Sequence, residues 1–138
     1  MTLKSVRWGL AVLALLLCYL ITVACAFGWV AIYGHLIHPG QPDAHYHAYA
    51  QLSTPWVALI TGIPVFFGAG WWIARKATEN PTGTALAMVL LYLAVDFAFL
   101  AGAPAGSLPV ALMAANLVCK VAAVFAGCAW ARRARAAP

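Results

Sequence analysis

The sequence contains very few charged residues. Asp, Glu, Lys and Arg make up only 8% of its 138 residues, against about a quarter in an ordinary soluble domain. Hydrophobic residues make up 65%, and a soluble fold of this length could not bury so much apolar surface. The composition therefore excludes an ordinary soluble domain. It indicates a single integral membrane domain, residues 1–138, which has the lipid bilayer as a partner.

The sequence also lacks the short motifs of common enzymes and metal sites. Its cysteines lie in apolar runs without CxxC spacing, and we expect them to be small packing residues: Cys18, Cys25, Cys119 and Cys128. No nucleophile–base pair stands out, so an enzyme is the least favoured function. The net charge of +5 comes from chain ends and loops, without a basic stripe carrying exposed aromatics, which argues against a nucleic-acid partner.

Four apolar stretches are each long enough to cross a bilayer as a helix, which takes about 20 residues. Clusters of proline and glycine separate them. Because a helix satisfies its own backbone hydrogen bonds in lipid, the sequence predicts an all-α fold, an integral membrane four-helix bundle. The predicted spans are residues 8–33, 55–73, 84–103 and 108–130, with an outer loop at 34–54.

The basic residues outside these spans predict the orientation. They all fall on one side of the predicted membrane: Lys4, Arg7, Arg75, Lys76, Arg132, Arg133 and Arg135. By the positive-inside rule both termini face the cytoplasm (N-in/C-in), and we expect a bacterial inner membrane. Residues 72–75 and residues 130–132, at the ends of the second and fourth spans, each begin with Trp and end with Arg. This similarity leaves open that the bundle consists of two tandem helical hairpins.

Two charged residues lie inside the predicted spans. At 1.5 Å per residue, Asp96 lies about 20 Å in from the inner end of its helix and Lys120 about 16 Å in. Asn116, one turn from Lys120, lies about 22 Å in. A charge at this depth costs about 3 kcal/mol and needs a partner. We therefore predict an intramembrane polar cluster of Asp96, Asn116 and Lys120, which either fixes helix register or belongs to a transport site.

All four histidines fall in the outer loop. His35, His38, His45 and His47, with Asp43 as an oxygen donor, are candidate ligands for zinc or copper. The alternative is that these amphipathic side chains simply suit a membrane interface. If residues 45–47 are extended, His45 and His47 are the better pair of ligands. If that stretch is helical, they point apart, and His35 with His38 is the better pair.

Two further patterns concern helix shape and packing. Pro64 cannot donate to the carbonyl of Ile60, which predicts a helix kink beside Thr61. Small residues recur at four-residue spacing, which allows close approach of a partner helix in this chain or in another. These are Ala24 and Gly28, Ala94, Ala98 and Gly102, Ala111 and Ala115, and Ala122 and Ala126.

The sequence leaves three functions open. The first is a non-enzymatic accessory subunit that assembles with itself or with a larger membrane complex. The second is a small transporter or ion-coupled carrier that uses Asp96 and Lys120. The third is a periplasm-facing metal-binding protein that uses the histidine-rich loop.

Overall fold

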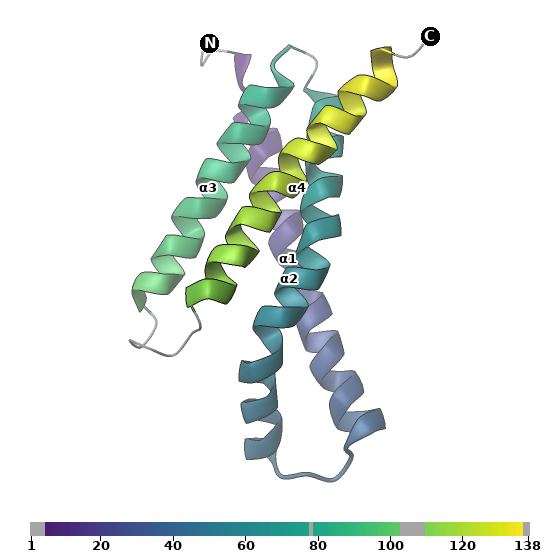
Figure 1. Cartoon of the computed structure of the whole chain (residues 1–138), viewed down its shortest axis with the longest axis vertical. Helices are drawn as coiled ribbons and strands as arrows, with labels where there is room; N and C mark the ends of the chain where they lie inside the picture. The colour runs from purple at the N-terminus through teal and green to yellow at the C-terminus, as the bar shows by residue number, and fades with distance from the viewer. Residues whose placement is uncertain (1–4, 78, 103–109, 137–138) are drawn as a thin grey trace.

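The computed structural model describes residues 5–77, 79–102 and 110–136, and these form four long helices and one short π-helix (Figure 1). The elements are α1 (Trp8–Ile32), η2 (Tyr33–Ile37), α2 (Asp43–Lys76), α3 (Pro81–Gly102) and α4 (Val110–Ala136). Each of the four long helices is long and apolar enough to cross a membrane. The predictions of an all-helical chain and of transmembrane helices are therefore confirmed.

Local sequence explains where several helices begin and end. Asn80 precedes α3, and its Oδ1 accepts a hydrogen bond of 2.9 Å from the Gly83 backbone N–H, which is an N-terminal cap. Pro81 then occupies the first helical position, where its missing N–H costs nothing. At the C-terminal end of α2, Arg7 donates to the carbonyl of Lys76 and Arg135 donates to the carbonyl of Arg75. These guanidinium groups satisfy acceptors that a helix C-terminus leaves free.

The second helix is much longer than the predicted span. The prediction placed its start near residue 55, but α2 already begins at Asp43, so the outer loop predicted at 34–54 shrinks to residues 38–42. Hydropathy locates the apolar part of a helix and says nothing about polar turns that continue it. Residues 43–54 are polar but contain several good helix formers. Gly40, with a φ of 80°, makes the turn between the two helices.

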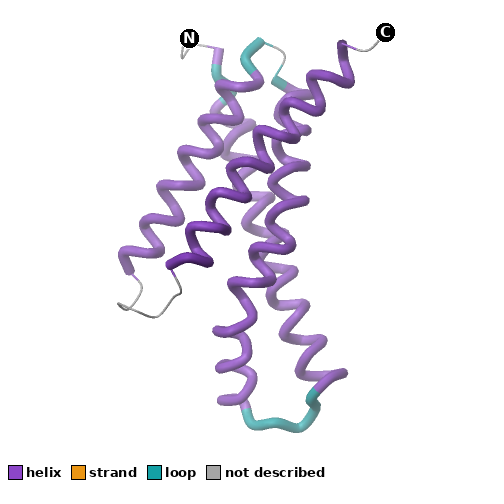
Figure 2. The backbone as a smooth tube through the Cα atoms, viewed as in Figure 1, coloured by secondary structure: helices purple, strands orange, loops and turns teal. Residues whose placement is uncertain are grey.

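The two hairpins differ in length. At 1.5 Å per residue, the 34 residues of α2 span about 51 Å and the 22 residues of α3 about 33 Å. The α1–α2 hairpin consequently projects past the far ends of α3 and α4, while both termini lie at the opposite end of the molecule (Figures 1 and 2). A bilayer core is about 30 Å thick, so α2 is long enough to carry the histidines beyond it.

Glycines allow α2 and α4 to pack backbone against backbone. A Cβ at Gly70 would overlap the backbone of Val124, and one at Gly127 would overlap the backbone of Phe67. Around this crossing, Ile73 and Val124 are fully buried, as are Met88 and Tyr92 from α3. The small residues that the sequence pattern singled out behave differently. Those whose exposure the structure describes are all exposed or half-buried rather than buried, including Ala94, Ala98, Ala122 and Ala126.

Candidate functional site

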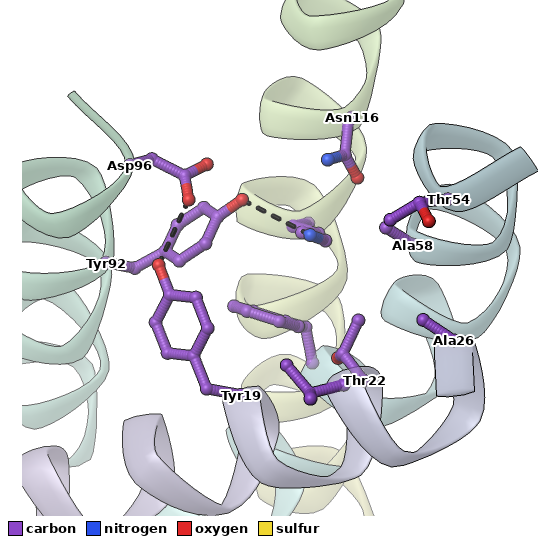
Figure 3. Close-up of a pocket in the computed structure, with 11 residues that line it drawn as sticks. Tyr19, Thr22, Ala26, Thr54, Ala58, Tyr92, Asp96 and Asn116 are labelled. Atoms are coloured by element: carbon purple, nitrogen blue, oxygen red, sulfur yellow. Dashed lines mark hydrogen bonds between the residues drawn. The ribbon is translucent and has the colours of Figure 1, made fainter. Parts of the chain in front are cut away.

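A cavity of about 220 Å³ lies among all four long helices. It sits closer to the C-terminal end of α3 than to the N-terminal end of that helix, because Asp96 is only six residues from Gly102. Its lining combines polar and apolar side chains (Figure 3). They are Tyr19, Thr22, Val23 and Ala26 from α1, Thr54, Ala58 and Phe66 from α2, Tyr92 and Asp96 from α3, and Asn116 and Lys120 from α4.

Lys120 is buried in the wall of this cavity. Only 5% of its surface is exposed, and its Nζ donates a hydrogen bond of 3.3 Å to the Tyr92 hydroxyl. The ammonium also lies 5.3 Å from the ring centroids of Phe66 and Tyr92, within the range of a cation–π interaction. Gly62 provides the space for the lysine stem, since a Cβ there would come within 2.5 Å of the Lys120 Cε.

Asp96 reaches the cavity from α3. The Tyr19 hydroxyl on α1 donates to its Oδ1 at 3.0 Å, and the rings of Tyr19 and Tyr92 lie 5.9 Å apart. Each charged residue therefore has a tyrosine hydroxyl as hydrogen-bond partner (Figure 3). No ion pair within 4.0 Å joins Asp96 to Lys120 among the described residues. The two charges share one site without neutralising each other by direct contact.

Asn116 lies one helical turn from Lys120 on the same face of α4. Its Oδ1 is buried and has no hydrogen-bond partner in the described part of the chain. A buried polar atom without a partner costs free energy comparable to a lost hydrogen bond, so it is a candidate contact for a bound group. The three residues predicted to cluster, Asp96, Asn116 and Lys120, thus line one cavity.

The two tyrosines were not predicted from the sequence. Tyr92 precedes Asp96 by four residues, and such pairs share a helix face, so this spacing was a usable signal. Tyr19 had no comparable signal, because its contact with Asp96 joins α1 to α3 across 77 residues. Only the packing of the first helix against the third brings its hydroxyl to the carboxylate.

The region around Pro64 remains helical within α2. The Thr61 hydroxyl donates to the Val57 carbonyl at 2.7 Å, a bond back to the preceding turn that is common for threonine in membrane helices. It therefore does not bond the Ile60 carbonyl that Pro64 leaves without its usual donor. A kink at Pro64 stays a prediction.

The histidines lie at the projecting end of the α1–α2 hairpin. His35 is part of η2, His38 follows it, and His45 and His47 lie in the first turns of α2, where two residues of separation point side chains apart. Aromatic contacts surround Tyr33: its ring stacks on Tyr49 at 3.5 Å between centroids, and its hydroxyl lies 3.3 Å from the His45 Nε2.

These histidines do not form a complete set of metal ligands. Residues 5–77, which contain all of them together with Asp43, hold no group of three His, Cys, Asp or Glu side chains placed to bind one ion. Zinc or copper binding at the hairpin stays a prediction, and metal titration of the purified protein would test it.

Comparison with known proteins adds no assignment. No protein-family model, no curated protein and no solved structure matches the chain.

Proposed function

We propose that this protein is a small integral membrane carrier that binds a polar solute in the cavity between its four helices. The observation that supports this proposal best is the buried Lys120, which lines the same cavity as Asp96 and Asn116. The Asn116 Oδ1 has no hydrogen-bond partner among the residues that the structure describes. A purely structural ion pair would gain most by direct contact, because each lone charge in a membrane is costly. Here hydrogen-bonding capacity is left free on the cavity side.

The free capacity can be counted from the chemistry of the groups. An ammonium has three donors, and Tyr92 accepts one of those of Lys120. A carboxylate offers about four lone-pair sites, and the Tyr19 hydroxyl occupies one of those of Asp96. A solute that entered the cavity could hydrogen-bond to the remaining donors of Lys120 and the remaining lone pairs of Asp96. It could also bond to Asn116, one helical turn from Lys120.

The proposed topology is a four-helix bundle in a bacterial inner membrane with cytoplasmic termini. The one-sided basic residues support it, as do the two arginines that cap α2 at the end where the termini lie. The cavity would then lie in the outer half of the membrane. Reporter fusions after Pro138 and at Asp43 test this topology. An active periplasmic reporter on the C-terminus would refute it.

Access of water to the cavity tests the carrier function without knowledge of the solute. Ala58 lines the cavity, whereas Ile60, two residues away on α2, is 69% exposed on the outside of the structure. In a background without native cysteines, Ala58→Cys should react with a charged thiol reagent applied from either side of membrane vesicles. Ile60→Cys, which faces lipid, should not. Equal, slow labelling of both positions would contradict a carrier.

Assembly into a larger complex is a second candidate function. It is supported by the outward-facing small residues of α3 and α4 and by a groove of about 400 Å³ on α3, next to Ala94 and Ala98. In lipid, such residues allow close contact with a further helix. Native mass measurement in mild detergent tests this role. An oligomer that Ala98→Phe converts to monomer would support assembly of further copies, and a monomeric native protein would argue against self-assembly.

A further inference from the structure

We propose that the cavity binds a small zwitterion, a solute that carries one ammonium and one carboxylate group on a short carbon frame. This inference rests on the proposed function and names the class of solute. Three features of the cavity support it: its balance of charge, the lack of a direct ion pair between Asp96 and Lys120, and its size.

The balance of charge in the cavity disfavours a simple ion as the solute. Asp96 and Lys120 are the charged residues that line the cavity, and their charges cancel. A bound monovalent anion or cation would leave one net charge in a low-dielectric site, which is strongly unfavourable. A zwitterion keeps the sum at zero and can pair with both residues at once.

The arrangement of donors and acceptors matches the two ends of such a solute. Because Asp96 and Lys120 form no direct ion pair and are each held by a tyrosine hydroxyl, an ammonium can approach the carboxylate while a carboxylate approaches the lysine. The buried Oδ1 of Asn116 offers a further acceptor to the ammonium. The hydroxyls of Tyr19 and Tyr92 hydrogen-bond to the two protein charges and thus act as positioning residues.

The cavity limits the solute to a small molecule. Its 220 Å³ corresponds to about seven water molecules at ~30 Å³ each. Thr22 and Thr54 add hydroxyl groups at its edge, and Val23, Ala26 and Ala58 supply apolar surface. A short aliphatic amino acid has both the charges and the size that this lining accommodates.

A set of three related probes tests the inference on the full-length protein in lipid nanodiscs. L-alanine carries both charged groups, propionate lacks the ammonium, and ethylamine lacks the carboxylate. We expect calorimetric titration to give saturable binding of L-alanine, about tenfold or more tighter than that of either single-charge probe, because each probe loses one charged hydrogen-bonding end. Propionate or ethylamine binding as tightly as L-alanine would overturn the inference.

Variants provide a second measurement. Lys120→Met and, separately, Asn116→Ala should each weaken L-alanine binding about tenfold or more. Arg133→Gln, which removes an exposed charge near the C-terminal end of α4, should leave binding unchanged. If Lys120→Met fails to fold, the three-probe comparison and Asn116→Ala still decide. Absence of saturable L-alanine binding, in a protein whose Ala58→Cys variant reacts with charged reagents from both sides, would refute the zwitterion while leaving the carrier intact.

Discussion

Substitution of Gly70 by alanine should separate α2 from α4. The new Cβ would lie 2.9 Å from the Val124 Cα and closer still to its carbonyl oxygen. Because the obstructing atoms belong to the backbone of α4, no side-chain rotation can make room. Moving the Val124 Cα alone to the 3.4 Å of ordinary contact takes about 0.5 Å, and the closer carbonyl oxygen requires a larger separation of the two backbones. Overpacking of this kind costs about 1–3 kcal/mol.

Gly68 provides a matched control on the same helix. A Cβ at Gly68 would meet nothing within 4 Å, so Gly68→Ala changes helix propensity without steric conflict. Replacement of glycine by alanine inside a helix is itself favourable by up to about 1 kcal/mol, and this gain is common to both variants. The difference between them therefore isolates the helix–helix contact, and we expect Gly70→Ala to be about 1–3 kcal/mol less stable than Gly68→Ala.

The measurement is reversible unfolding in mixed micelles of a mild detergent and dodecyl sulfate, followed by far-ultraviolet circular dichroism. Gly127→Ala should repeat the loss from the other side of the crossing, since its Cβ would overlap the backbone of Phe67. If Gly70→Ala and Gly127→Ala unfold at the same detergent composition as Gly68→Ala, the backbone contact between α2 and α4 does not stabilise the fold and the reasoning fails.

Three further predictions concern the cavity. Tyr19→Phe removes the hydroxyl that donates to Asp96 and should lower the unfolding free energy by about 1.5–3 kcal/mol, as expected for a bond to a charged group; a loss below about 0.5 kcal/mol would mean that the bond contributes little. Asp96→Ala should lower the unfolding free energy more than the double variant Asp96→Ala, Lys120→Met, because the single variant leaves the Lys120 charge buried without a counter-charge. If the changes in unfolding free energy are strictly additive, the two residues do not couple. Gly62→Ala should leave the fold intact, since the nearest atoms to its new Cβ belong to the Lys120 side chain and not to a backbone, but it should displace the lysine and weaken L-alanine binding. Unchanged binding would place the lysine outside the site.

The sequence alone predicted four helices that are each long and apolar enough to cross a membrane, and the structure contains four such helices in the residues it describes. Only 8% of its residues are charged, and apolar stretches of this length have no other stable conformation in lipid. The same reasoning located Asp96, Asn116 and Lys120 at similar depth, because rise per residue is constant along a helix. Depth is a one-dimensional quantity, and it placed these three residues at one level, where the structure has all three in the lining of one cavity.

Tertiary structure decided the full length of α2 and the contacts between helices, which neither hydropathy nor depth in the membrane specifies. The polar first turns of α2 continue its helix beyond the apolar span, so the predicted loop became part of a projecting hairpin. Tyr19 reaches Asp96 only because α1 packs against α3, and Gly62 makes room for Lys120 only because α2 crosses α4 at close range. Such contacts depend on the rotation of each helix about its axis. In chains that are apolar on every face, the sequence leaves that rotation undetermined, and close packing of neighbouring side chains sets it.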